Sequence, residues 1–117
     1  MLQHVSLEVP VDRVTAMLDF WGLLGFDQVE APAEIDDFVT WLQRGDTQIH
    51  LLHTEEPVVP PLGHCAVVAE DFEDAVMRLR ASGYEVQEAQ ELWGCPRAFA
   101  LAPAGHRVEL MAAPPVG

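Results

Sequence analysis

Hydrophobic and polar residues follow the same order of patterns in each half of the chain. In the first half, residues 2–9 alternate between apolar and polar and predict a β-strand. Apolar residues then recur at helical spacing over residues 11–24, where Asp12 is a candidate cap and Gly25 a candidate stop. Alternation returns in a short strand and a hairpin, which we place at 26–31, 38–43 and 48–53, with a turn at 44–47. The first half therefore predicts the order β-α-β-β-β.

The second half predicts the same elements in the same order. A strand at 64–69 precedes a helix at 72–81, and Gly83 is the candidate stop of that helix. The remaining strands are expected at 84–89, 98–102 and 107–111, with a hairpin turn at 103–106.

Local similarities between the two halves indicate an internal repeat. The matching pairs are His4 with His64 (an offset of 60), Gly25 with Gly83 (an offset of 58), and His50 with Glu109 (an offset of 59). Three nearly equal offsets, in the same order along the chain, are the mark of two tandem modules.

We therefore predict a single α+β domain over residues 1–117. Its modules span about 1–55 and about 63–113, and a proline-containing linker at 56–62 joins them. Two tandem βαβββ modules are expected to form a curved, cleft-bearing mixed β-sheet.

Composition narrows the class of protein and its partners. The 117 residues include 19 acidic and 6 basic side chains, with a net charge of −13, and half are hydrophobic, which supports a folded core. All the basic residues are arginines, so Schiff-base and P-loop chemistry, which need lysine, are excluded. Such an acidic surface opposes binding to nucleic acid or anionic membranes and attracts metal ions and cationic small molecules.

Further features of the sequence predict a cytoplasmic protein. No apolar segment approaches the length of a membrane span, and the first residues lack the basic and apolar regions of a signal peptide. Cys65 and Cys95 are too few for a disulfide framework and are expected to be buried free thiols.

Four potential metal ligands occupy repeat-related positions. His4 and His64 begin the first strand of each module, while His50 and Glu109 lie in the last strands. Imidazole and carboxylate groups are common ligands of divalent metals. Strand alternation places His4, His50 and Glu109 opposite the apolar core, whereas it leaves the face of His64 undecided. These four residues are therefore candidates for one shared metal site.

The other two histidines do not fit this pattern. His53 faces the core side of its strand, and His106 lies in the last hairpin turn. We expect both to be structural or solvated.

Four short motifs occur in order along the chain: His4-Val5, Phe20-Trp21-x-x-Leu24-Gly25-Phe26, Gly63-His64, and Pro103-x-Gly105-His106-Arg107-Val108-Glu109-Leu110. Together they resemble the vicinal oxygen chelate superfamily, which includes glyoxalase I, the bleomycin-resistance proteins and the extradiol dioxygenases. The last motif resembles the superfamily's Asp-Pro-x-Gly-x-x-x-Glu-Leu signature, with Ala102 in place of Asp. The resemblance extends from Leu2 to Met111.

The resemblance implies a site and a cofactor. Its metal residues fall on His4, His50, His64 and Glu109, with Glu109 also the catalytic carboxylate, and it implies one divalent ion (Fe, Mn, Ni or Zn). His4, His64 and Glu109 match the two-histidine, one-carboxylate set of the dioxygenases and fosfomycin enzymes, which leaves positions open for a chelating substrate. His50 stands where glyoxalase I has Glu, which weakens the glyoxalase interpretation.

The resemblance also implies a homodimer. Each site would then take His4 and His50 from one chain and His64 and Glu109 from the other. The alternative is a monomer whose two modules pair internally.

The sequence leaves two functions open. A third possibility is that the chain is a module whose site has lost its function. The first is a metal-dependent lyase, isomerase, transferase or dioxygenase whose ion chelates neighbouring oxygens of a small-molecule substrate. The second is a metal-free bleomycin-resistance-type protein that stacks a cationic or aromatic small molecule on Trp41 and Trp93, unless these residues only pack the core. Arg97, with Arg107, either attracts an anionic substrate or forms surface ion pairs.

Overall fold

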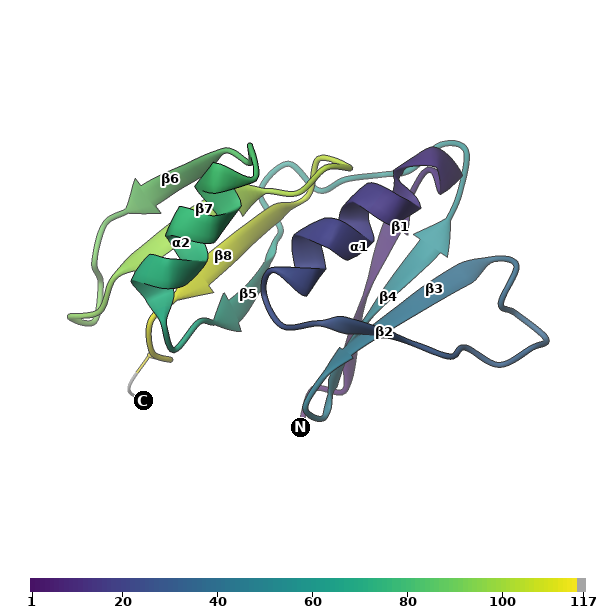
Figure 1. The fold of residues 1–117 in the computed structure, drawn as a ribbon, viewed down its shortest axis with the longest axis horizontal. Helices are drawn as coiled ribbons and strands as arrows, with labels where there is room; N and C mark the ends of the chain where they lie inside the picture. The colour runs from purple at the N-terminus through teal and green to yellow at the C-terminus, as the bar shows by residue number, and fades with distance from the viewer. Residues whose placement is uncertain (116–117) are drawn as a thin grey trace. The chain divides into compact units, whose positions relative to one another are not determined.

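The computed structural model describes residues 1–115 and contains two compact units, Met1–Val59 and a second that begins at Pro60. Each unit contains a four-stranded mixed sheet and a short α-helix (Figure 1). The predicted α+β fold of two repeated βαβββ modules is therefore confirmed.

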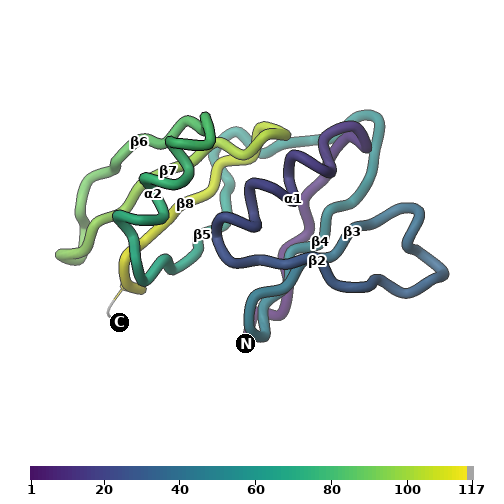
Figure 2. The backbone as a smooth tube through the Cα atoms, in the orientation of Figure 1, coloured from purple at the N-terminus to yellow at the C-terminus, as the bar shows by residue number. Residues whose placement is uncertain are grey.

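The first module forms a sheet in the order β1-β4-β3-β2. Its elements are β1 (His4–Val9), the 3₁₀ turn η1 (Val11–Arg13), α1 (Val14–Gly22), β2 (Asp27–Val29), β3 (Val39–Arg44) and β4 (Thr47–His53). β1 runs parallel to β4, whereas the other ladders are antiparallel. Figure 2 traces how the chain leaves β1, passes through α1 and comes back beside β1 only at β4. Such a crossover is what parallel strands require.

The hairpin of β3 and β4 sets the register of the site residues. Arg44 pairs with Thr47, so the turn contains only Gly45 and Asp46. Gly45 has φ of +60°, a conformation that glycine adopts without steric cost. The resulting register places Trp41 directly opposite His50.

The predicted first helix differs from the observed one at its beginning. Residues 11–22 form the 3₁₀ turn η1 followed by α1, and the expected cap at Asp12 is wrong, because no side-chain cap bond is present at either start. Asp12 lies inside η1, which begins after the extended Pro10, so its carboxylate is not placed before the first free N–H groups. Gly25 ends the segment as predicted, with φ of +88°.

Apolar side chains of the first module cover one face of its sheet. The buried set is Val9, Met17, Phe20, Trp21, Leu24, Phe26, Leu42, Ile49 and Leu51. Leu42 pairs with Ile49 across β3 and β4, so the neighbouring positions Trp41 and His50 turn to the opposite face.

The second module repeats this arrangement in the order β5-β8-β7-β6. Its elements are β5 (Cys65–Val68), α2 (Phe72–Ala81), β6 (Val86–Ala89), β7 (Arg97–Leu101) and β8 (Arg107–Met111). The side chain of Asp71 accepts a hydrogen bond from the Asp74 amide and so caps α2. Ala66 pairs with Glu109 just as Ser6 pairs with His50, so the repeat is preserved residue by residue in the ladders.

Within the described residues, no helix is both long and apolar enough to cross a membrane. Cys65 and Cys95 are free as predicted, but the expected full burial is wrong, because both are partly exposed. Partial burial raises the pKa of the Cys65 thiol.

Candidate functional site

Three rings of the first module form a stack on the sheet face opposite its core. The ring of His50 lies between those of Trp41 and His4, with centroid distances of 4.2 Å to Trp41 and 4.0 Å to His4. The interplanar angles are 4° and 16°, so the three rings are nearly parallel. The cross-strand pairing of Trp41 with His50 brings the first two rings together, and β1 supplies the third.

A chain of side-chain hydrogen bonds determines which nitrogen of His50 carries a proton. Gln43 donates from Nε2 to the Gly45 carbonyl at 2.8 Å, which leaves its Oε1 to accept from Gln48 Nε2, also at 2.8 Å. The Oε1 of Gln48 then accepts from His50 Nε2 at 2.8 Å. Because a carbonyl can only accept, this chain assigns the proton to Nε2 and the lone pair of a neutral His50 to Nδ1.

Burial, and to a smaller extent the neighbouring His4, lowers the pKa of His50. Both effects favour the neutral imidazole, which is the state that binds metal ions.

The stacked geometry keeps His4 and His50 from sharing one ion in their present orientations. The lone pair of an imidazole nitrogen lies in the plane of its ring, and a bound metal sits about 2 Å away in that plane. Two stacked rings whose centroids are 4.0 Å apart and whose planes are only 16° from parallel do not direct their lone pairs to one point at such a distance. One of the two rings must rotate before both can bind the same ion.

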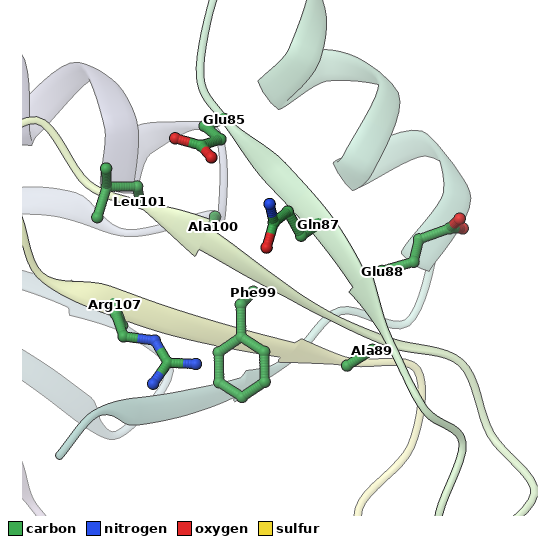
Figure 3. A pocket seen from close by; sticks show the side chains of 8 residues that line it. All are labelled: Glu85, Gln87, Glu88, Ala89, Phe99, Ala100, Leu101 and Arg107. Carbon is green, nitrogen blue, oxygen red and sulfur yellow. The ribbon is translucent and has the colours of Figure 1, made fainter. Parts of the chain in front are cut away.

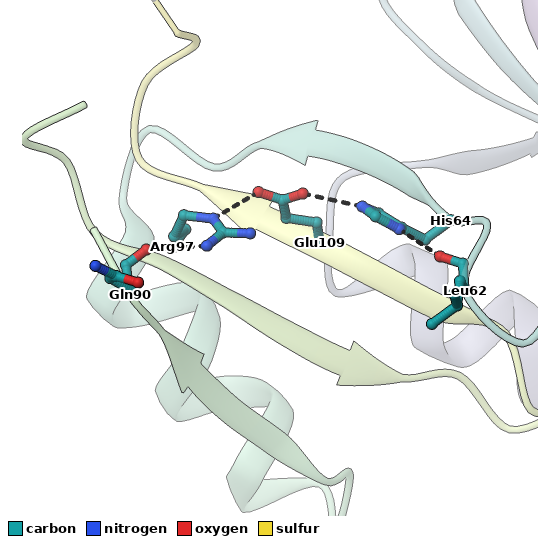
Figure 4. Close-up of polar contacts among 5 residues, drawn as sticks. All are labelled: Leu62, His64, Gln90, Arg97 and Glu109. Carbon is teal, nitrogen blue, oxygen red and sulfur yellow. Dashed lines mark hydrogen bonds and ion pairs between the residues drawn. The ribbon is translucent and has the colours of Figure 1, made fainter. Parts of the chain in front are cut away.

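The second module brings His64 and Glu109 together (Figure 4). His64 Nε2 lies 3.1 Å from Glu109 Oε1, and His64 Nδ1 donates to the Leu62 carbonyl at 2.9 Å. Arg97 donates from Nε to Glu109 Oε2 at 2.9 Å and from Nη1 to the Gln90 carbonyl, also at 2.9 Å. Glu109 is 6% exposed, so this carboxylate is almost fully removed from water.

These contacts fix which atoms of His64 and Glu109 face each other. The Leu62 carbonyl assigns a proton to His64 Nδ1, so Nε2 of the neutral ring presents a lone pair toward the carboxylate oxygen. Two such atoms at 3.1 Å are close enough to share a proton or to bind one metal ion.

Phe99 is a residue of this site that the sequence analysis missed. It pairs with Glu109 across β7 and β8, and its ring meets that of His64 edge-on at 5.1 Å. The guanidinium groups of Arg97 and Arg107 lie 5.3 and 4.4 Å from its ring centre. The repeat contained the signal, because Phe99 lies 58 residues after Trp41, the same offset that relates Gly83 to Gly25.

Arg97 and Trp93 have partners within their own module. Arg97 forms an ion pair as one of the two sequence interpretations predicts, but the pair with Glu109 is buried rather than on the surface. Trp93 donates from its indole nitrogen to the Ala113 carbonyl at 3.0 Å, and Arg97 lies 5.8 Å from its ring centre.

The structure thus forms one pair of predicted ligands in each module, His4 with His50 and His64 with Glu109. Over residues 1–115 it contains no group of three or more His, Cys, Asp or Glu side chains that could hold a metal ion.

The two remaining histidines lie within the fold. His53 Nε2 is 2.8 Å from the Thr40 hydroxyl, which agrees with the structural role predicted for it. His106 is only 4% exposed, so it is structural rather than solvated.

Comparison with protein-family models identifies the family to which the chain belongs. The profile of the Glyoxalase/Bleomycin resistance protein/Dioxygenase superfamily matches residues 2–110, which is nearly the whole chain. The chain belongs to this superfamily. Members of the superfamily commonly bind a metal and act on small molecules.

Solved structures show the same fold at low sequence identity. A protein from Bacillus anthracis classed with the glyoxalase family is 22% identical, with 95% of this chain and 93% of that chain covered and a TM-score of 0.86. Oxidase ChaP-H2 is 16% identical, with 98% and 94% covered and a TM-score of 0.77. A lactoylglutathione lyase from Agrobacterium tumefaciens is 17% identical, with 95% and 93% covered and a TM-score of 0.68. No curated protein matches the sequence at a significant level.

A superfamily fold does not by itself specify a reaction, because one fold hosts many chemistries. The oxidase and the lyase illustrate this for the present fold. The function of this superfamily member therefore has to be argued from its own side chains.

Proposed function

We propose that the protein is a small metal-dependent enzyme that acts on a small molecule with two neighbouring oxygen atoms. His64 and Glu109 hold the divalent ion, Fe, Mn, Ni or Zn, together with His4 and His50. Reaction classes that suit this site are a lyase or isomerase, which move a proton, and a dioxygenase.

The observation that carries the proposal is the 3.1 Å approach of His64 Nε2 to Glu109 Oε1. Neighbouring ligands of an octahedral ion with bonds of about 2.1 Å are separated by roughly 3 Å, so this spacing fits two adjacent ligands. The outer atoms of both side chains are bound to protein groups, which holds the inner atoms next to each other. The residues present therefore fit a metal.

When bound, the ion would supply Lewis-acid stabilisation of negative charge on the substrate oxygens. Arg97 neutralises Oε2 of Glu109 and leaves Oε1 available. In a proton-transfer reaction Glu109 is the residue that takes and returns the proton, and in an oxygen-dependent reaction it serves as a charged ligand. The Leu62 carbonyl holds His64 in the tautomer that leaves Nε2 free to bind.

The two histidines of the first module differ in how readily they can contribute. Gln3 binds Nδ1 of His4 at 2.7 Å, so Nε2 remains for a ligand bond. His50 has only Nδ1 left, and its ring is covered on both faces. We propose that His4 binds first and that His50 joins after the stack opens.

The proposal includes a two-fold homodimer in the cytoplasm. The edge strands are β1 and β2 in one sheet and β5 and β6 in the other, and an edge strand can pair with a strand of another module. Each site then combines His4 and His50 of one chain with His64 and Glu109 of a second. Light scattering at micromolar concentration tests this part: a monomer contradicts the shared site but leaves metal binding intact.

Metal binding is tested on chelator-treated full-length protein by thermal unfolding with and without each ion. We expect an ion at 100 times its Kd to add about 2.7 kcal/mol to the free energy of unfolding. His64→Ala should abolish the shift, whereas the matched control His53→Gln should keep it, because His53 bonds Thr40 and lies outside the site. Equal curves with and without Mn(II), Ni(II), Zn(II) and Fe(II) would contradict the metalloenzyme.

The reaction class is tested with two substrates on the metal-loaded protein. Oxygen uptake with catechols indicates a dioxygenase, and conversion of the glutathione–methylglyoxal adduct indicates a lyase. For a proton-transfer reaction, Glu109→Gln should retain an oxygen ligand but lose about 10²–10⁴-fold in rate.

One observation favours a second function, a metal-free protein that binds a cationic aromatic molecule. The parallel rings of Trp41, His50 and His4 already form a stack, and a net charge of −13 attracts cations. Ethidium is a suitable probe in the presence of chelator. Tight binding that Trp41→Ala abolishes and Trp93→Ala retains, together with no metal effect on unfolding, would favour this function over the enzyme.

A further inference from the structure

A hollow lies on the sheet of the second module (Figure 3). Its volume is about 400 Å³, and Glu85, Gln87, Phe99, Leu101 and Arg107 contribute to its lining. Phe99 pairs with Glu109, and Leu101 pairs with Arg107, so these side chains share the face that carries the candidate ligand.

Arg107 differs from the other charged residues of the site because its guanidinium group has no polar partner among the described residues. Its guanidinium group rests on the Phe99 ring at 4.4 Å, and the residue is half-buried. Within residues 1–115 this guanidinium makes no ion pair and no hydrogen bond, although the protein contains 19 acidic residues. The ring fixes the position of a cation whose hydrogen-bond donors remain unused.

Arg97 does not share this property. Its charge is balanced by Glu109, with which it forms a 2.9 Å hydrogen bond. The ring of Phe99 therefore lies between one arginine that is neutralised and one that is not. In the described part of the chain, Arg107 thus places an unpaired positive charge on this face.

We infer that Arg107 binds the carboxylate of a small organic acid, with Phe99 as the support for its guanidinium group. A guanidinium fork fits a carboxylate in a bidentate way. A phosphate dianion fits less well, because Glu85 and Glu88 line the same hollow and one arginine would have to balance two charges.

This inference rests on the proposed function where it concerns the substrate. Arg107 and Glu109 lie two residues apart on β8, a separation of roughly 7 Å along the strand. A substrate whose carboxylate binds Arg107 can therefore direct its other end toward Glu109 on the same face. The substrate class is a small carboxylic acid with two neighbouring oxygens at its other end.

The experiment uses metal-free, full-length protein in the presence of chelator, with benzoate and its neutral analogue benzamide as probes. Two-dimensional ¹H–¹⁵N NMR follows the backbone amides of β7 and β8 and the arginine Nε–H signals. We expect benzoate at millimolar concentration to shift the signals of Phe99, Leu101 and Arg107 in a saturable way. Benzamide should leave them in place over the same range.

Variants separate the site from general charge effects. Arg107→Gln should weaken benzoate binding at least about tenfold, because charged hydrogen bonds are lost. Arg107→Lys keeps the charge without the fork and should give an intermediate affinity. Arg13→Gln removes an equal charge from an exposed arginine in η1 of the other module and should change nothing. The NMR spectrum of each variant reports directly whether it is folded.

Several outcomes would overturn the inference: no shift with benzoate at tens of millimolar, equal binding of benzamide, or unchanged affinity in Arg107→Gln. Tighter binding of inorganic phosphate than of benzoate would overturn the assignment to carboxylates. Because chelator is present, carboxylate binding can succeed where metal binding fails, so this result and that of the metal experiment are independent.

Discussion

Trp41 and Phe99 hold equivalent places in the two modules, each directly opposite a candidate ligand in the antiparallel ladder. Trp41 stacks face to face on His50, whereas Phe99 meets His64 with its edge and contacts two guanidinium groups. The repeat thus places an aromatic ring beside each ligand pair, and the neighbours of that ring differ. The ligand pair of the first module lies in a stack of aromatic rings, whereas that of the second module lies in a network of charged side chains.

Breaking the ion pair of Arg97 with Glu109 should be costly. We expect Arg97→Met to lower the free energy of unfolding by about 3 kcal/mol, because a buried carboxylate loses its partner. The matched control is Arg78→Met, whose ion pair with Asp74 is exposed and should contribute less than about 1 kcal/mol. Urea unfolding measures both changes, and equal effects would contradict the buried pair.

The lowered pKa of His50 predicts that stability depends on pH. Below about 6.5 the unfolded chain binds a proton at this position while the folded chain resists it, so stability should fall as the pH decreases toward the folded pKa. His50→Gln removes the titrating group and should flatten the dependence between about pH 7 and 5. Urea unfolding at a series of pH values checks this, and an unchanged slope in His50→Gln would contradict it.

The two helix starts should respond differently to the loss of an aspartate. Asp71→Ala removes the side chain that accepts from the Asp74 amide at 3.4 Å, so we expect a loss of about 0.5–1 kcal/mol. Asp12→Ala removes no cap bond and should change the free energy of unfolding by less than about 0.5 kcal/mol. Thermal unfolding compares the pair, and a larger cost at Asp12 would refute the description of η1.

Gly25 and Gly22 offer a matched test of backbone conformation. Gly25 has φ of +88°, and an added Cβ would lie 3.1 Å from Arg44 Cδ, so Gly25→Ala should cost about 1–2 kcal/mol. Gly22 belongs to α1, and a Cβ there meets nothing within 4 Å. Gly22→Ala should therefore stabilise the protein by about 0.5–1 kcal/mol. Denaturant titrations of both variants decide the matter, and effects of the same sign would count against this account.

Local signals explain why much of the fold follows from the sequence. The prediction of α2 at 72–81 matches its observed bounds, because an apolar stripe and Gly83 mark its extent, and Asp71 caps it. Strand alternation correctly separates buried Ile49 and Leu51 from the ring of His50, which stacks on Trp41 on the opposite face. The break between η1 and α1 carries no such signal, since both parts have helical periodicity.

The contacts within the site depend on side-chain orientation, which periodicity does not describe. Alternation gives the face of His50, but whether its ring stacks on His4 or turns away from it depends on rotamers and on the Gln48 hydrogen bond. The partner of Arg97 is likewise undecided from sequence, because its strand pairs with β8 in a register that only the hairpin turn determines. The repeat offset is the one sequence signal that indicates which residue lies opposite a candidate ligand. It relates Phe99, opposite Glu109, to Trp41, opposite His50.

The two oxygens of Glu109 have separate tasks, and this separation affects how the site can change over time. Oε2 is committed to Arg97, so a replacement of Arg97 would alter the electron density on Oε1 while every group that meets a ligand stays in place. Related chains could then differ in how strongly this carboxylate binds a ligand because they differ at position 97, which is not part of any ligand motif. A search for functional divergence in this superfamily should therefore follow the partners of its carboxylates as well as the carboxylates themselves.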